Sequence, residues 1–334
     1  MKNKIDLEDK IFVAGSNGMV GKAICRELLK NGYGLKENNG FLLTPSRKEL
    51  DLLNYSEVDN WFKLNKPTVV VLAAAKVGGI NANNIKPAEF ILENLKIQNN
   101  VIELAWRHGI KRLLFLGSSC IYPKYAKQPI EEDSLLKDEL EPTNQWYAVA
   151  KIAGIKLCQA LRKQYKFDAI SLMPTNLYGP GDNYHPENSH VMAALIRKFY
   201  LASRDSLKTV NCWGTGAPFR EFLHVDDLAN AVVFALENWD PDSPGSPIDN
   251  KGEPLLILNV GTGKDLSIKQ LSQKIAKHVN YKGKIIWDID KPDGTPKKLL
   301  NIDKIKSLGW CPKIKLDEGI IKTIELINNK NIFD

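Results

Sequence analysis

Long apolar runs are missing from this sequence of 334 residues. The first apolar stretch, residues 11–14, is far too short for a signal peptide or a membrane span, and the residues before it are polar and mixed in charge. Internal repeats and low-complexity segments are also absent. We therefore expect a globular protein that resides in the cytoplasm.

Cysteine is scarce, and the cysteines present follow no binding pattern. They are odd in number, widely spaced and free of any CxxC pair: Cys25, Cys120, Cys158, Cys212 and Cys311. This spacing argues against a disulfide framework and against a zinc site, because both need paired or clustered cysteines. We expect free thiols in a reducing compartment and no bound metal.

Blocks of lysine and arginine are lacking too, although the formal net charge is +7. The sequence therefore gives no sign of a nucleic-acid partner. The excess fits a mild preference for anionic small molecules, but a solvated basic surface is the more ordinary explanation. Hydrophobic residues make up 43% and charged residues 25%, so a chain of this length can form one large and one smaller domain.

The first half of the chain alternates short apolar runs with amphipathic stretches. The apolar runs predict buried parallel strands at residues 11–14, 41–43, 69–74, 113–116 and 169–173. The amphipathic stretches predict helices near residues 20–30, 55–64, 87–107 and 145–164. This alternation predicts an α/β fold with a doubly wound, Rossmann-type parallel sheet.

After residue 173 the pattern changes. Pro, Gly and Asn are dense at residues 174–189 and predict a loop, and later segments predict a helix near 191–201, a strand end and helix at 221–237, a loop at 240–254, a strand at 255–260 and a mixed tail. We expect a discontinuous division into two domains. Residues 1–179 and 222–262 form the Rossmann-type domain, and residues 180–221 and 263–334 form a smaller mixed α/β substrate domain.

Three glycines follow the first predicted strand directly, in Gly15-Ser16-Asn17-Gly18-Met19-Val20-Gly21. Glycines at this GxxGxxG spacing allow a tight turn, bring backbone N–H groups against a pyrophosphate and place a helix N-terminus at the same point. Glycine triplets also occur in ordinary turns. The position between a strand and a helix favours a dinucleotide site.

The end of the second predicted strand bears on the choice between NAD and NADP. An NAD site usually carries Asp or Glu there to hold the ribose 2′-hydroxyl. This chain has Thr44-Pro45-Ser46-Arg47 instead. A surface arginine is the ordinary alternative, but a guanidinium without a competing carboxylate suits a 2′-phosphate and favours NADP.

Tyr147 and Lys151 form a YxxxK pair on one face of a predicted helix. A tyrosine hydroxyl has an ordinary pKa of about 10, and we expect a nearby ammonium and the positive nicotinamide of an oxidised cofactor to lower this pKa. Tyr147 could then donate a proton to a carbonyl oxygen. Ser118 follows another predicted strand, where it can cap a turn or donate to the same oxygen. A YxxxK pair is common on solvated helices, but downstream of the glycine segment it indicates a reductase.

Together these motifs resemble the extended short-chain dehydrogenase/reductase family. Five longer segments resemble its GDP-4-keto-6-deoxy-D-mannose 3,5-epimerase-4-reductases, and they lie at residues 73–80, 116–123, 173–180, 220–227 and 291–296. The resemblance runs from about residue 11 to residue 310. It implies the substrate GDP-4-keto-6-deoxy-D-mannose, inversion at C3 and C5, and reduction of the C4 ketone by NADPH.

The resemblance also implies roles for individual residues. The expected catalytic residues are Ser118, Cys120, Tyr147, Lys151 and His190, with the thiol and the imidazole exchanging protons at C3 and C5 in an order that stays open. The expected NADP(H) contacts are Gly15, Ser16, Asn17, Gly18, Met19, Val20, Gly21, Arg47, Leu116, Gly117, Ser118, Ser119, Lys151, Pro174, Thr175, Asn176, Leu177 and His190. Without the resemblance, Cys120 would be read as a small buried hydrophobe and His190 as a structural helix-end residue.

The expected GDP-sugar contacts are Lys198, Trp213, Arg220, Asp293 and Lys298. The sequence departs from the family at two places. Lys198 stands where arginine is frequent, so the bidentate guanidinium is lost. Ser16-Asn17 stands where His-Arg is frequent, so binding of the 2′-phosphate depends more on Arg47. Lys76 receives no role, and Asn94 corresponds to a structural helix asparagine. Family members form homodimers through helices that include the one bearing Tyr147.

Other functions remain open at this stage. A 4-epimerase on the same fold retains NAD and needs no acid–base pair at C3 and C5. A dehydratase has Thr followed by Asp-Glu around the position of Ser118, where this chain has Ser119 and Cys120. A non-catalytic NADP sensor would not need Tyr147 and Lys151.

Overall fold

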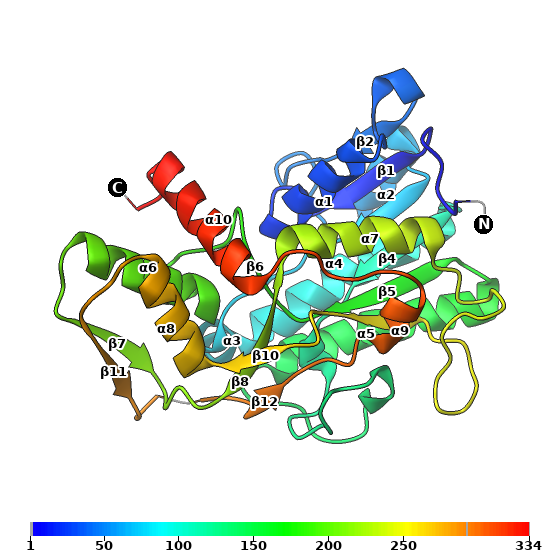
Figure 1. The fold of residues 1–334 in the computed structure, drawn as a ribbon. Helices are drawn as coiled ribbons and strands as arrows, with labels where there is room; N and C mark the ends of the chain where they lie inside the picture. Colours follow the sequence, from blue (N-terminus) through cyan, green and yellow to red (C-terminus); the bar gives the residue numbers. More distant parts are fainter. Residues whose placement is uncertain (1–2, 292, 334) are drawn as a thin grey trace.

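The computed structural model describes residues 3–291 and 293–333, so Pro292, which lies in one of the matched segments, is outside the described residues. Its centre is a six-stranded parallel sheet in the order β2-β1-β3-β4-β5-β9 (Figure 1). The strands are β1 Lys10–Ala14, β2 Phe41–Leu43, β3 Val69–Leu72, β4 Arg112–Leu116, β5 Ala169–Pro174 and β9 Ile257–Val260. All six strands are parallel, but their order reverses at β1, because β2 lies on one side of β1 and β3 lies on the other. This switch point is where open α/β sheets bind ligands.

Helices cover both faces of the sheet, which confirms the predicted doubly wound α/β class (Figure 1). On one face α1 packs against α7, and on the other α4 packs against α5 and α2. These helices are α1 Met19–Lys30, α2 Tyr55–Asn65, α4 Pro87–Arg107, α5 Gln145–Tyr165 and α7 Val225–Asn238. Their starts follow local rules, since Asn54 accepts the N–H groups of Ser56 and Glu57 at α2, and Pro87 opens α4.

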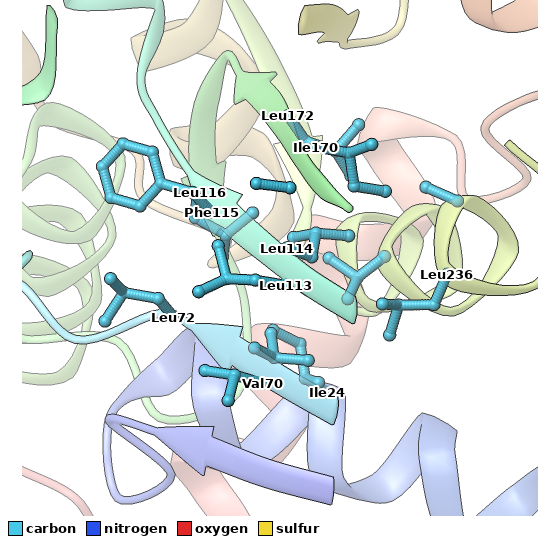
Figure 2. Close-up of a cluster of buried hydrophobic side chains, with 14 of the residues drawn as sticks. Ile24, Val70, Leu72, Leu113, Leu114, Phe115, Leu116, Ile170, Leu172 and Leu236 are labelled. Atoms are coloured by element: carbon cyan, nitrogen blue, oxygen red, sulfur yellow. The ribbon is translucent and has the colours of Figure 1, made fainter. Parts of the chain in front are cut away.

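Helices on both faces explain why the central strands read as unbroken apolar runs. Every residue of β3 and β4 is buried. Figure 2 shows side chains of these strands meeting those of the helices, among them Ile24 from α1 and Leu236 from α7. The rigid layer fixes the carboxyl ends of the strands, where the candidate site lies.

A second set of elements carries a core of its own. One sheet has the order β10-β8-β12 with β6 paired to β8, and β11 pairs with β7. The strands are β6 Asn176–Tyr178, β7 Thr209–Trp213, β8 Phe219–His224, β10 Asp265–Ser267, β11 Lys284–Asp288 and β12 Lys297–Lys298. The helices around them are α6 Val191–Arg204, α8 Ile268–His278 and α10 Leu316–Lys330. Their buried apolar side chains form a cluster separate from that of the large sheet.

Some local predictions were wrong. The expected loop at residues 174–189 contains strand β6, which is held by parallel pairing with β8, a contact that local composition does not reveal. The third strand ends at Leu72 rather than residue 74, because Ala73 and Ala74 lie against the glycine segment. The short elements α3 Ile80–Ile85 and α9 Asp303–Ser307 were not predicted as separate helices.

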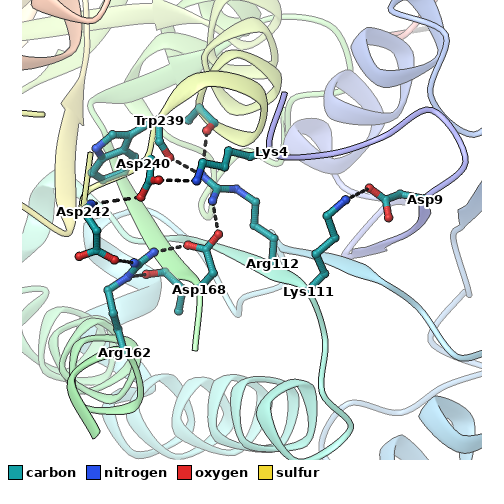
Figure 3. Close-up of polar contacts among 11 residues, drawn as sticks. Lys4, Asp9, Lys111, Arg112, Arg162, Asp168, Trp239, Asp240 and Asp242 are labelled. Carbon is teal, nitrogen blue, oxygen red and sulfur yellow. Dashed lines mark hydrogen bonds and ion pairs between the residues drawn. The ribbon is translucent and has the colours of Figure 1, made fainter. Parts of the chain in front are cut away.

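At the amino ends of the strands, a polar cluster ties the sheet to the segment after α7 (Figure 3). The buried guanidinium of Arg112 pairs with Asp168 and donates to the carbonyl oxygen of Trp239. Arg162 pairs with Asp168 and, at 2.6 Å, with Asp242. This end of the sheet is therefore occupied by internal ion pairs and hydrogen bonds. Within residues 3–291 and 293–333, no helix has the length and apolar character needed to cross a bilayer.

Candidate active site

The glycine segment forms a tight connection between β1 and α1. Gly15 has φ of +86°, in the left-handed region, and a Cβ there would lie 2.7 Å from the backbone nitrogen of Ala74. A Cβ on Gly21 would lie 2.1 Å from the carbonyl oxygen of Gly15. Both positions therefore require glycine, because a side chain would push the helix away from the strand.

The same segment has unused donors suited to an anion. Gly18 precedes α1 and supplies no side-chain cap to its first N–H groups. The hydroxyl of Ser16 is buried and has no hydrogen-bond partner among the described residues. Asn17 is exposed, whereas Met19 and Val20 are half-buried in the first helical turn. A pyrophosphate at this helix end would satisfy these donors, so the residues present fit a dinucleotide.

Arg47 lies after β2, on the same edge of the sheet as the glycine segment. Its side chain is exposed, and no residue in the described part of the chain gives it a hydrogen bond or an ion pair. Its guanidinium is thus available to a 2′-phosphate.

Strand β4 ends at Leu116, at the carboxyl edge of the sheet beside β5. Gly117, Ser118 and Ser119 follow directly. A Cβ on Gly117 would lie 2.5 Å from the sulfur of Met173, so this residue has no room for a side chain. Ser118 opens the short helical turn η2 Ser119–Ile121, and its hydroxyl accepts the N–H of Cys120 at 3.2 Å. This turn places Ser118 and Cys120 together in front of α5.

Tyr147 and Lys151 lie on the face of α5 that covers this turn. The ammonium of Lys151 is buried, donates to the carbonyl oxygen of Leu116 at 2.7 Å and lies 5.8 Å from the ring centroid of Tyr147. Burial lowers the pKa of Lys151 to about 7. One carbonyl accounts for only one of three ammonium donors, so Lys151 can also bind a ribose hydroxyl.

The groups of the protein itself raise the pKa of Tyr147 and do not lower it. Burial raises the pKa of Tyr147, the neighbouring Cys120 raises it further, and a hydrogen bond with Ser118 only partly offsets both effects. Desolvation disfavours the phenolate more than the surroundings stabilise it. The neutral phenol, which is the proton-donating form, is therefore the favoured state.

Cys120 is half-buried and has two donors at its sulfur. The Nδ2 of Asn144 lies 3.5 Å from Sγ, and the Nζ of Lys298 lies 3.7 Å from it. Lys298 was expected among the GDP-sugar contacts, but here its ammonium faces the thiol. Asn144 was missed, because an asparagine directly before a helix is normally read as a cap, and this one makes no capping bond.

His190 directly precedes α6 and does not cap it with its side chain. His190 is solvent-exposed as a residue, but partial desolvation by the surrounding protein lowers its pKa and favours the neutral ring. The preceding segment is anchored, since the carbonyl oxygen of Asn188 accepts the N–H of Gly79 at 3.3 Å. Among residues 3–291 and 293–333, no hydrogen bond joins His190 to Cys120 or to Tyr147.

The segment after β5 is occupied with internal contacts. Thr175 is buried, and its N–H donates to the carbonyl oxygen of Val260 at 3.0 Å. The side chain of Asn176 donates to the carbonyl oxygen of Glu221 at 2.9 Å. Pro174 is the last residue of β5, and Leu177 is half-buried in β6. The segment of residues 174–177 therefore connects the large sheet to the smaller one.

The remaining expected GDP-sugar residues gather around β7 and β8. Trp213 is 50% exposed at the end of β7, and the Nζ of Lys198 lies 5.7 Å from its ring centroid. Arg220 donates to the carbonyl oxygen of Asp293 at 3.4 Å, and the carboxylate of Asp293 accepts the N–H of Thr215 at 2.8 Å. The structure thus gathers cations and one aromatic face in the smaller set of elements.

Asn94 and Lys76 have structural surroundings. The buried side chain of Asn94 accepts the N–H of Lys76 at 2.9 Å and donates to its carbonyl oxygen at 3.0 Å. The ammonium of Lys76 pairs with Glu89 and Glu93. Both residues hold the segment after β3. In the described part of the chain, no cluster of three or more His, Cys, Asp or Glu side chains could hold a metal ion.

Comparisons with known proteins agree with this architecture. The family model described as NAD dependent epimerase/dehydratase family matches residues 11–249. A putative GDP-L-fucose synthase 2 from Arabidopsis thaliana is 54% identical over 95% of this chain and 90% of its own length. The GDP-L-fucose synthase of Escherichia coli strain K12 is 47% identical over 98% and 99%. A solved GDP-mannoheptose C4 reductase from Campylobacter jejuni with NADP bound is 36% identical, with a TM-score of 0.85 over 97% of this chain and 99% of that chain.

Proposed function

The chain belongs to the NAD dependent epimerase/dehydratase family and, within it, to the GDP-L-fucose synthases, and from this premise we propose its reaction. It epimerises GDP-4-keto-6-deoxy-D-mannose at C3 and C5 and reduces the C4 ketone to give GDP-L-fucose. The observation that carries this proposal is the position of a thiol, Cys120, beside Ser118 and Tyr147. A reductase needs only the hydroxyl pair, whereas an epimerase also needs a proton carrier next to it.

The cofactor is NADP(H), which supplies the hydride for C4 when it is bound. The Gly15–Gly21 segment and the start of α1 hold its pyrophosphate, supported by the unpartnered hydroxyl of Ser16. Arg47 binds the 2′-phosphate, and the spare donors of Lys151 bind the ribose next to the nicotinamide.

Tyr147 and Ser118 hold the C4 oxygen of the sugar. The raised pKa of Tyr147 keeps its proton on the phenol, so Tyr147 can donate a hydrogen bond and then the proton itself. Both groups stabilise the negative charge that develops on this oxygen during epimerisation and during reduction. One oxygen site therefore serves all steps.

Cys120 and His190 exchange the protons at C3 and C5. Both carbons flank the C4 carbonyl, so removal of either proton gives an enolate whose oxygen is the one that Tyr147 and Ser118 hold. Inversion requires a base on one face of the sugar and an acid on the other. The lowered pKa of His190 leaves a neutral imidazole able to accept a proton near neutral pH.

Lys198, Trp213, Arg220 and Asp293 hold the GDP part of the substrate, with Lys298 at its sugar end beside Cys120. Support comes from the concentration of cations around an exposed aromatic ring. Ammonium and guanidinium groups suit a diphosphate, and an indole face suits a base or a sugar.

The domain division proposed from the sequence gives residues 1–179 and 222–262 to the cofactor and residues 180–221 and 263–334 to the substrate. The two separate apolar clusters support this division. A homodimer through α4 and α5 is supported by the exposed apolar side chains Leu92, Trp146 and Val149 on these helices. Five free cysteines support a cytoplasmic location.

The function is tested by incubating the protein with GDP-4-keto-6-deoxy-D-mannose and NADPH in deuterated water and identifying the product sugar. We expect GDP-L-fucose that carries deuterium at C3 and C5. A reduced sugar with unchanged C3 and C5 would indicate a C4 reductase without epimerase activity. Absence of turnover despite NADPH binding would indicate a cofactor sensor.

A further inference from the structure

Two lysine ammonium groups lie near the ring of Trp213. Its ring lies at the end of β7 and is 50% exposed. The Nζ of Lys198, from α6, lies 5.7 Å from the ring centroid, and the Nζ of Lys291, from the segment after β11, lies 5.6 Å from it. Each distance lies within the range of cation–π attraction, so the indole ring has two ammonium neighbours from different segments of the chain.

These two charges lack an acidic partner. In the part of the chain that the structure describes, neither ammonium forms an ion pair, and the contact of Lys198 is with the carbonyl oxygen of Asn211 at 2.9 Å. The nearby carboxylate of Asp293 is used by Thr215, whose hydroxyl donates to it at 2.7 Å. Both charges lie near the same exposed ring, so an anion bound at this ring would be attracted by each of them.

Lys297 differs from Lys291 in the compensation of its charge. Its Nζ also lies over an aromatic ring, 5.9 Å from the centroid of Phe219. However, it pairs with Asp265 at 3.3 Å, so its charge is compensated within the protein. Lys291 has the aromatic contact without the carboxylate.

We propose that Lys291 is a substrate-binding residue that, together with Lys198 on the ring of Trp213, binds the diphosphate of the GDP-sugar. This inference rests on the proposed function, which supplies a nucleoside diphosphate as the ligand class. A lysine ammonium is a point charge without the bidentate fork of arginine. Two separate ammonium groups therefore match the two charged phosphates better than one does.

The test is calorimetric titration of the full-length protein with GDP, GMP and guanosine. We expect Lys291→Gln to weaken GDP binding about tenfold, the order of one charge-assisted hydrogen bond. The effect should be smaller for GMP and absent for guanosine, because guanosine lacks phosphates. Lys297→Gln is the matched control and should bind GDP as the unchanged protein does. Trp213→Leu should show the same phosphate-dependent loss of affinity. Trp213→Phe should keep most of the parent's affinity for GDP, because it retains an aromatic ring.

Unchanged GDP affinity in Lys291→Gln, with normal binding by the parent protein, would overturn this inference and leave the proposed function intact. An equal loss for guanosine would also overturn it, because the contact would then be with the base or ribose. A parent protein that binds NADPH but not GDP would overturn the proposed substrate itself, and the inference with it.

Discussion

The Nζ of Lys298 lies 3.7 Å from the Sγ of Cys120, although the two residues are 178 positions apart in the sequence. Strand β12 brings them together, because its pairing with β8 sets Lys298 opposite Arg220. Asn144 is the second donor to this sulfur. The smaller set of elements thus reaches the edge of the large sheet where Cys120 lies.

Replacing Lys298 should slow epimerisation more than cofactor binding. In Lys298→Gln the sulfur loses its cationic donor, so a negative charge on it is less stabilised when it gives up its proton. We expect solvent deuterium to enter the sugar about tenfold more slowly, with an unchanged Kd for NADPH. Lys297→Gln, on the same strand but paired with Asp265, is the control. Equal slowing in both variants would remove Lys298 from the account.

Lys151 should give the cofactor-free protein a distinct dependence of stability on pH. Burial lowers its pKa to about 7 from 10.5, so between these values the unfolded chain binds more protons than the folded one. Deprotonation of Lys151 should therefore raise the free energy of unfolding by up to about 1.4 kcal/mol per pH unit as the pH rises from about 7 towards 10.5.

Denaturant titrations of the parent protein and of Lys151→Met at pH 7, 8 and 9 test this slope. We expect Lys151→Met to have a higher free energy of unfolding than the parent at pH 7. This difference should become smaller as the pH rises, because only the parent gains stability from deprotonation of the buried amine. A constant difference across the series would show that the buried amine does not titrate in this window.

Glu221 should stabilise the junction between the two sheets. Its buried carboxylate accepts the N–H groups of Thr262 at 2.5 Å, Gly263 at 2.6 Å and Leu300 at 3.0 Å. Glu221→Gln loses the charged acceptor, and we expect about 2 kcal/mol lower stability, together with a higher KM for the GDP-sugar because Arg220 is adjacent. Glu253→Gln, at an exposed site, should leave thermal unfolding and KM unchanged. A Glu221→Gln protein as stable as the parent would show that the charge is dispensable.

Arg47 should determine the preference for NADPH over NADH. Arg47→Ala removes the guanidinium proposed for the 2′-phosphate, and we expect the KM for NADPH to rise about tenfold. The KM for NADH should stay unchanged, because NADH lacks this phosphate. Parallel initial-rate measurements with the two cofactors give the ratio, and a similar rise for both would assign Arg47 a structural role.

Much of the large sheet could be predicted because its signals are local. Strand β4 is buried on both faces and therefore reads as an unbroken apolar run. The glycine segment and the Tyr147–Lys151 pair are also local, since each depends on spacing within one turn or one helix face. Strand β7 carries a local signal that the prediction did not use, the alternation of exposed residues with buried Val210 and Cys212.

The contacts that complete the site depend on pairing between distant segments. Nothing in the sequence around Asn144 distinguishes a donor to a thiol from a helix cap. The contact of Lys298 with Cys120 follows from the alignment of β12 on β8, which local pattern cannot reveal. The raised pKa of Tyr147 also could not be predicted from the sequence, because its largest cause is burial, which is a property of the fold.

In the proposed reaction, Cys120 exchanges protons beside the ketone oxygen held by Ser118 and Tyr147. This role is tested most directly in Cys120→Ser, by following deuterium uptake from solvent into GDP-4-keto-6-deoxy-D-mannose, with NADPH affinity measured in parallel. We expect uptake at C3 or C5 or both to fall by about two orders of magnitude or more while NADPH binds normally. Uptake at the parent rate at both carbons would contradict it.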